Sequence, residues 1–278
     1  MTNWERFAEL RVVLVAPAGS HNLGSVARIL KNMGLRQLIL VNPLCHPTDP
    51  QARLMAVHAQ DILQTTQIVT SLPAALADCR RVIGTTGRRE NYPPEWKIED
   101  PRLALPWLLG DMMGAVVFGA EDRGLSNQEL ALCHRQVMIP ADPVYPSLNL
   151  AQAVAICCYE LRMAALTGDL SKPDYFLSDS SGFSTESQRV PVQVLEDFYD
   201  HLKAILLKIG YLQSHTSDRK LSKFRALFSR AGLSLKEVAM LRGILRQLSW
   251  FHQIVNPENN DSPPHLNDSH IGSKDEIN

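Results

Sequence analysis

Short apolar runs alternate with segments of helical periodicity along the first 166 residues of the chain. The apolar runs predict buried strands over 11–16, 37–41, 67–69, 81–85, 114–118 and 136–139. Between them the spacing of apolar residues predicts helices over 22–33, 50–64, 73–79, 126–134 and 148–166. This alternation predicts an α/β domain with a mostly parallel sheet over residues 1–168. Ligands of such sheets bind where loops leave the carboxyl ends of the strands.

The pattern changes after residue 168. Residues 169–190 are rich in Ser, Asp and Gly, which predicts a flexible linker. Apolar residues then recur at helical spacing over 193–210, 219–230 and 234–253, so we expect a small all-helical module over 191–255. Pro, Asn, Asp and Ser dominate 256–278, where we expect disorder.

Charge is distributed unevenly, although the formal net charge is only −1. Residues 191–255 hold ten Lys and Arg against five Asp and Glu, and residues 256–278 hold one against five. A basic module therefore lies between a neutral domain and an acidic tail. Such a module suits the phosphates of a nucleic acid.

Cysteine content and the length of apolar runs indicate the cellular compartment and which partners to expect. Five cysteines without CxxC spacing favour neither a metal site nor a disulfide framework, so we expect a reducing, cytoplasmic compartment. No apolar run reaches the roughly 18 uninterrupted residues of a membrane helix, and no secretory signal is apparent. We therefore expect neither a metal nor a membrane partner.

Three stretches combine turn residues with a following helix. They are HNLGSVARILKNMG (21–34), VVFGAEDRGLSNQEL (116–130) and IPADPVYPSLNLAQAVAICCYEL (139–161). In the first, Val26, Ile29, Leu30 and Met33 share one apolar stripe, and Arg28 lies opposite it. Arg28 is either a solvated helix arginine or a contact to phosphate or sugar beside a helix N-terminus that favours anions.

The second stretch places Gly119 directly after a strand, where a ligand could approach the backbone closely. Glu121 could hold a ligand, or it could hold a neighbouring loop through backbone N–H groups. Ser126 and Glu129 have the spacing of a capping box, which accounts for both residues.

The third stretch has three prolines within seven residues, which stiffen the loop after a strand. Ser147 could be nothing more than the N-cap of the 148–166 helix, and Asn149 could serve in the same way. That interpretation leaves unexplained why such a rigid loop precedes the helix.

Several common catalytic motifs are absent from the sequence. GxGxxG, GxxxxGK[ST], HExxH and GxSxG do not occur. Dehydrogenase, kinase, metallohydrolase and α/β-hydrolase functions therefore lose their usual support.

The three motifs NxGSVAR…MG, FGxExxGL and IP…SLNLAxAVxI, in this order, closely resemble the signatures of the SpoU (TrmH-like) branch of the SPOUT RNA methyltransferases. Residues 195–212 and 237–248 resemble the helical extension of the TrmJ subgroup. The resemblance implies a sheet closed by a C-terminal deep trefoil knot, an S-adenosyl-L-methionine site formed by the knot loops, and an obligate homodimer. It also implies 2′-O-methylation of cytidine or uridine at nucleotide 32 of the tRNA anticodon loop.

The resemblance also implies roles for individual residues. Arg28 would act at the reacting ribose, where Ser147 and Asn149 would position the ribose or pass its proton toward solvent. Substrate RNA would contact Asn22 and Arg28, the loop residues Arg88 and Arg89, and the basic module 191–255. The residues implied at the cofactor are Thr85, Thr86, Gly119, Glu121, Gly124, Leu125, Ile139, Ser147 and Leu148.

Two other functions remain open from the sequence. One is 2′-O-methylation of ribosomal RNA or of another tRNA position, against which the TrmJ-like extension argues. The other is a non-catalytic RNA-binding protein that keeps the fold, which the presence of Arg28, Glu121, Ser147 and Asn149 disfavours.

Overall fold

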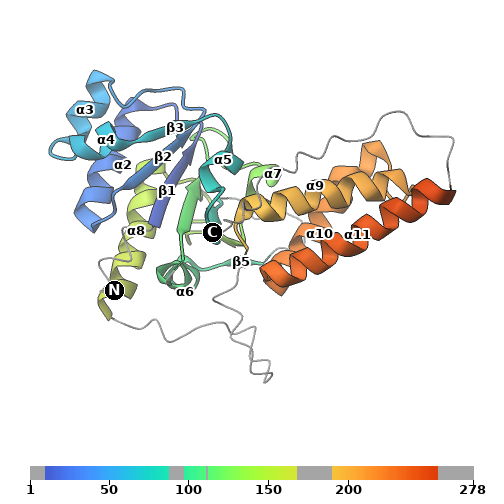
Figure 1. Cartoon of the computed structure of the whole chain (residues 1–278). Helices are drawn as coiled ribbons and strands as arrows, with labels where there is room; N and C mark the ends of the chain where they lie inside the picture. The colour runs from blue at the N-terminus through green and yellow to red at the C-terminus, as the bar shows by residue number, and fades with distance from the viewer. Residues whose placement is uncertain (1–9, 88–96, 111, 168–189, 256–278) are drawn as a thin grey trace, which may run out of the picture.

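The computed structural model describes residues 10–87, 97–110, 112–167 and 190–255 (Figure 1). Its seven strands form one parallel sheet in the order β3-β2-β1-β6-β4-β7-β5. The strands are β1 (Leu10–Val15), β2 (Gln37–Val41), β3 (Gln67–Val69), β4 (Arg81–Thr85), β5 (Ile98–Glu99), β6 (Gly114–Phe118) and β7 (Arg135–Val137). The parallel sheet predicted from the sequence is thus confirmed. The trefoil knot stays a prediction.

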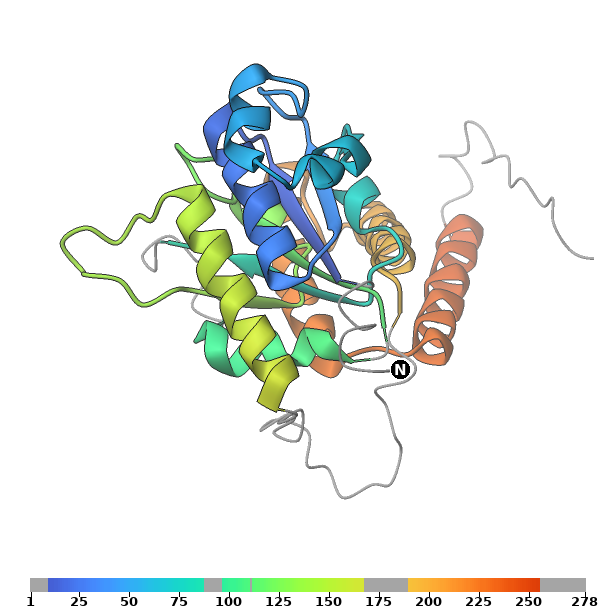
Figure 2. The same cartoon turned by 90° about the vertical axis from the view of Figure 1, so that its left-hand side faces the viewer.

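Helices cover both faces of the sheet because its central strands are apolar on both sides. One face packs against α2 (Ser20–Met33), α3 (Pro50–Ala56), α4 (Gln60–Thr65), the short α6 (Pro101–Ala104) with the 3-10 helix η2 (Leu105–Leu109), and α8 (Leu150–Thr167). The other face packs against α5 (Leu72–Leu76) and α7 (Asn127–Leu130). Figure 2 shows α2 and α8 side by side on the first face.

The single helix predicted over 50–64 is wrong. The chain forms α3 and α4 instead, separated at Val57, whose φ of 52° lies in the left-handed region that no helix continues through. Helix α3 approaches α2 closely. A Cβ on Gly24 of α2 would lie 2.1 Å from the carbonyl oxygen of Ala52.

Helix α8 is the element that, within the described ranges, has the length and composition to cross a membrane. In the structure it is a core helix, because Val154, Cys157, Cys158 and Leu161 are buried against α2 and the sheet. The Arg162 guanidinium donates a 2.9 Å hydrogen bond to the Met33 carbonyl oxygen.

The all-helical module consists of α9 (Val192–Lys208), the 3-10 helix η4 (Ser214–Thr216), α10 (Ser217–Ala231) and α11 (Leu235–Val255) (Figure 1). Helix α9 packs against both of the others, around a core that includes Phe198, Leu221 and Leu245. Val190, assigned above to the linker, is buried in this core, so the module begins there. The rest of the linker and the tail 256–278 lie outside the described residues.

The module is attached to the amino edge of the sheet. The Val192 and Gln193 amides donate to the carbonyl oxygens of Cys79 and Ala77, just before β4, at 3.0 and 3.2 Å. Ser229 of α10 donates through its hydroxyl to the carbonyl oxygen of His134, just before β7, at 3.1 Å. The carboxyl edge, where ligands of parallel sheets bind, is therefore left free by these contacts.

Candidate functional site

Glu121 ties two loops together at the carboxyl edge of the sheet. It follows β6, and the neighbouring strand β1 leads through residues 16–19 into α2. Its two carboxylate oxygens accept hydrogen bonds from the backbone N–H groups of Ala18 (3.0 Å) and Gly19 (3.1 Å). One of them also accepts from Nδ2 of Asn22, at 3.0 Å. Of the two roles considered for Glu121, the structure shows loop holding.

Asn22 links this carboxylate to the third motif. Nδ2 of Asn149 donates to Oδ1 of Asn22 at 2.9 Å, while Oδ1 of Asn149 accepts from the Ala151 amide at 2.9 Å. Because the Ala151 N–H can only donate, the end of the Asn149 side chain that faces it must be the oxygen, and Nδ2 of Asn149 then faces Asn22. The atom of Asn22 that accepts from Nδ2 must in turn be Oδ1, so that Nδ2 of Asn22 faces Glu121. We call Glu121, Asn22 and Asn149 the carboxylate–amide network.

The surroundings of Glu121 favour its charged form. Burial alone would raise the pKa of the carboxyl, but the hydrogen bonds from Ala18, Asn22 and Gly19 outweigh burial and lower the pKa below its usual value. The network is therefore anchored by a carboxylate at neutral pH. Each amide nitrogen of the network has a second hydrogen that can be donated to a ligand.

The glycines of the second motif serve the chain's own packing. A Cβ on Gly119 would lie 2.0 Å from the carbonyl carbon of Gly124, and Gly124 has a left-handed φ of 70°. The sequence suggested that a ligand could approach the backbone of Gly119 closely. In the structure the backbone of Gly124 and Leu125 occupies that position. This tight turn directs Glu121 toward the β1–α2 loop.

Two further loops meet the same edge of the sheet. Thr85, at the end of β4, donates through Oγ1 to the Val117 carbonyl oxygen at 3.0 Å, and the amide of buried Thr86 donates to the Val137 carbonyl oxygen at 2.9 Å. Ile139 and Leu148 are half-buried, and no hydrogen bond joins their backbone N–H groups to another described residue. Half-buried amides without a partner are the donors that a nucleoside-like ligand needs. These residues fit an adenosyl cofactor.

Arg28 is exposed on α2, as the apolar stripe predicted. It lies six residues beyond Asn22, which is about 9 Å along the helix axis. No contact among the described residues joins it to the carboxylate–amide network. Ser147 is likewise exposed in the loop before α8, whereas Arg88 and Arg89 lie outside the described residues.

The helix caps were predicted with mixed success. The capping box of Ser126 and Glu129 is confirmed. Of the two capping residues considered for the 148–166 helix, the structure shows Asn149 and not Ser147, because α8 starts at Leu150 and Asn149 accepts the amide hydrogens of its first turn. Asn149 therefore both caps α8 and joins the network, which leaves the Ser147 hydroxyl available for a ligand.

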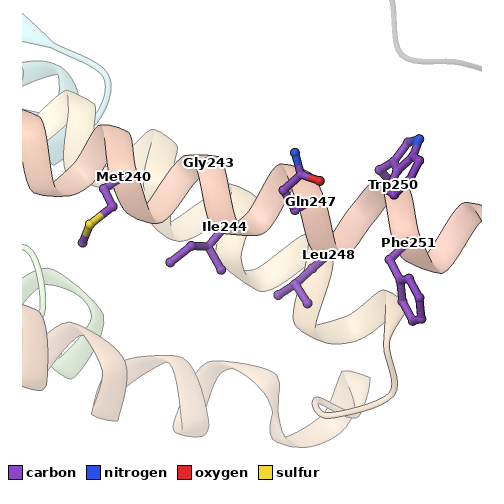
Figure 3. Close-up of a pocket in the computed structure, with 7 residues that line it drawn as sticks. All are labelled: Met240, Gly243, Ile244, Gln247, Leu248, Trp250 and Phe251. Carbon is purple, nitrogen blue, oxygen red and sulfur yellow. The ribbon is translucent and has the colours of Figure 1, made fainter.

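A hollow of another kind lies on α11 (Figure 3). It is lined by Met240, Gly243, Ile244, Gln247, Leu248, Trp250 and Phe251. The side chains are mostly apolar and exposed, and none carries a charge. This hollow therefore lacks the groups that hold a charged cofactor or a phosphate, and the carboxyl edge remains the candidate site. Nor does any group of three or more His, Cys, Asp or Glu among the described residues gather as a metal site would require.

A parallel sheet covered by helices on both faces places the protein in the α/β class, whose ligands bind at the carboxyl edge, and comparison with known proteins specifies the family. Residues 9–159 match the model of the SpoU rRNA methylase family, and residues 193–259 match that of the C-terminal domain of the tRNA methyltransferase TrmJ. The chain therefore belongs to the SpoU methylase family.

Individual relatives agree with this assignment. The chain is 40% identical to the tRNA (cytidine/uridine-2′-O-)-methyltransferase TrmJ of Escherichia coli O6:K15:H31, over 86% of this chain and 94% of the relative. It is similar to the crystal structure of TrmJ from Z. mobilis ZM4 with a TM-score of 0.72, 28% identity and coverage of 86% and 98%. A probable methylase family protein from Haemophilus influenzae gives a TM-score of 0.55 and 33% identity, with coverage of 90% and 99%.

Proposed function

We propose that this protein is an S-adenosylmethionine-dependent tRNA 2′-O-ribose methyltransferase that acts on nucleotide 32 of the anticodon loop. The observation that carries the proposal is the carboxylate–amide network, which joins all three sequence motifs at the carboxyl edge of the sheet. The function named for the TrmJ relatives, tRNA methylation on cytidine or uridine, supports the same substrate class.

The cofactor fits the loops after β4, β6 and β7. The half-buried Ile139 and Leu148 would donate their amides to it, and Thr86 and Leu125 would close the apolar side of the pocket. When bound, S-adenosylmethionine supplies an electrophilic methyl group next to a positive sulfur. Glu121 would act on the cofactor indirectly, because its carboxylate is already occupied by the β1–α2 loop.

The protein must make a ribose hydroxyl react, although it is a poor nucleophile. Alignment and removal of its proton are the two requirements. A guanidinium group offers hydrogen-bond donors and no acceptor, so a base role does not suit Arg28. Arg28 would instead grip the adjacent phosphate and stabilise developing negative charge. Asn149 can donate one further hydrogen bond to the ribose. Its oxygen is used by the cap, which leaves the Ser147 hydroxyl to pass the proton toward solvent.

A homodimer would complete this site. Ile156, Tyr159, Met163 and Leu166 are exposed along one face of α8 to between 36% and 54%. A contiguous apolar face of this kind is typical of an interface. Because the loop with Ser147 leads directly into α8, a partner on this face of α8 would lie on the same side of the sheet domain as the third motif.

The experiment that tests the function is methyl transfer from labelled cofactor to tRNA, followed by mapping of the modified nucleotide. We expect one 2′-O-methyl group at nucleotide 32. Transfer to ribosomal RNA or to a different tRNA position would support the alternative substrate, and RNA binding without any transfer would indicate a non-catalytic protein.

A further inference from the structure

Most acidic side chains of the helical module are engaged within it. The ion pairs are Arg225–Glu196, Lys203–Asp218 and Arg242–Asp197. Glu237 is engaged at the start of α11, where it accepts hydrogen bonds from the amide and hydroxyl of Ser234 at 2.7 and 2.8 Å. The basic excess of the module must therefore lie on cations outside these pairs.

Three of these cations form a row on α10. Arg219, Lys223 and Arg230 are exposed, and no acidic group within the described ranges lies at ion-pair distance from them. At about 100° per residue they fall within roughly 40° of one another, on the side opposite buried Leu221. We call them the α10 basic row.

The row has a fixed place on the molecule. On the inner side of α10, Phe228 packs edge-on against Phe198 of α9 with ring centroids 5.4 Å apart. Arg225 lies on the same inner side, over the ring of Tyr199, and Ser229 holds the helix to the sheet domain. The three cations are thus presented on a rigid surface.

The spacing of the row matches a polyanion. Along the helix axis the cations are about 6 and 10 Å apart, so that they span roughly 16 Å. A nucleic-acid strand carries one phosphate per nucleotide, so cations at these spacings can face phosphates that are one or a few nucleotides apart, and basic side chains bind phosphates without reading the sequence. Each cation can therefore meet a different phosphate of one strand.

We propose that the α10 basic row binds the phosphate backbone of the RNA substrate, an inference that rests on the proposed function. The row belongs to a module attached at the amino edge of the sheet, whereas the carboxylate–amide network lies at the carboxyl edge. A strand of five residues separates the edges by about 17 Å. The row therefore holds a part of the RNA away from the methylated nucleotide, and it contributes to binding and not to the methyl-transfer step.

The test compares two triple variants with equal loss of charge. One is Arg219→Ala, Lys223→Ala and Arg230→Ala; the control is Lys208→Ala, Lys236→Ala and Arg246→Ala, which removes exposed cations from α9 and α11. The dissociation constant of full-length tRNA is measured over a series of salt concentrations. For the first variant we expect at least about a tenfold weaker complex at low salt, and a salt slope reduced by about 2 to 3 because up to three phosphate contacts are lost.

Further measurements separate this inference from the proposed function. The first variant should keep its melting temperature, its cofactor affinity and its kcat at saturating tRNA, while KM rises with the dissociation constant. An unchanged slope, or an equal loss in the control variant, would overturn the role of the row. A wild-type protein that binds tRNA in this way but transfers no methyl group would instead contradict the proposed function and leave the row confirmed as an RNA contact.

Discussion

Arg28 is the side chain whose chemistry most directly tests the proposed reaction. It is exposed, has no partner among the described residues and does not contribute to the network. Arg28→Ala should therefore leave cofactor binding and stability intact, while methyl transfer falls on the order of 100-fold or more because charge stabilisation is lost. Single-turnover assays and calorimetry of cofactor binding measure the two effects. Arg36→Ala, at an exposed position before β2, is the control, and near-wild-type turnover in Arg28→Ala would refute the assignment.

Glu121 has a stability role that depends on pH. Because its pKa is lowered in the folded protein, its contribution is present above the ordinary value of 4.5 and is lost as the pH falls through the lowered value. Glu121→Gln should destabilise the protein by about 1–3 kcal/mol at pH 7 and by less at about pH 3, since the Gln amide cannot accept all three hydrogen bonds. Urea unfolding at both pH values measures this, with exposed Asp122→Asn as control. Equal destabilisation at the two pH values would contradict it.

The sequence predicted individual site residues better than their partners. The outward direction of Arg28 follows from apolar spacing alone, and the three motifs contain every member of the network. The sequence left the cap of α8 open between Ser147 and Asn149, because both suit an N-cap and the choice between them depends on where the helix starts. The backbone amides of Ala18 and Gly19 could not be identified, because a peptide group leaves no signal in the residue type.

The β6–α7 turn has no room for an added methyl group at Gly119. The Cβ of Gly119→Ala would lie 2.0 Å from the Gly124 carbonyl carbon, so the turn must open and carry Glu121 away from the β1–α2 loop. We expect a loss of stability of about 1–3 kcal/mol together with loss of methyl transfer. Gly87→Ala is the matched control, since no atom of the part of the chain that the structure describes lies within 4 Å of its added Cβ. Thermal unfolding of both variants tests this prediction. Equal melting temperatures would show that the turn accommodates the methyl group without loss of stability.

Most elements were predicted because their signal is local. Strands β2, β3, β4 and β6 have the predicted limits, since each is a short apolar run. Strands β2, β4 and β6 are mostly buried, as expected inside a parallel sheet, whereas β3 is an exposed edge strand. Strand β5 was missed because two residues cannot establish a pattern. The break at Val57 was missed because neither Gly nor Pro marks it. The break accompanies the close packing of α3 on α2, a contact between segments that no single window of the sequence contains.

Over the whole molecule, the sequence predicted which parts exist but not how they are joined. The basic character of the helical module follows from counting charges. Its attachment to the amino edge depends on contacts between Val192 and Cys79 and between Ser229 and His134, which lie far apart in the chain. For the proposed function, this arrangement predicts that mutations on the module change RNA binding and mutations at the carboxyl edge change methyl transfer, each without the other.

The exposed face of α8 gives a prediction about assembly. If this face forms the isologous interface of a homodimer, the same face of α8 is present from both subunits, so each substitution occurs twice within the interface. Tyr159→Glu with Met163→Glu should therefore place four carboxylates in one apolar interface and dissociate the dimer, which sedimentation velocity would show as a halved mass. Met240→Glu with Ile244→Glu, on the exposed apolar face of α11, tests the other large candidate surface in the same way. If only the α11 variant dissociates the dimer, the interface lies on the helical module and not on the sheet domain.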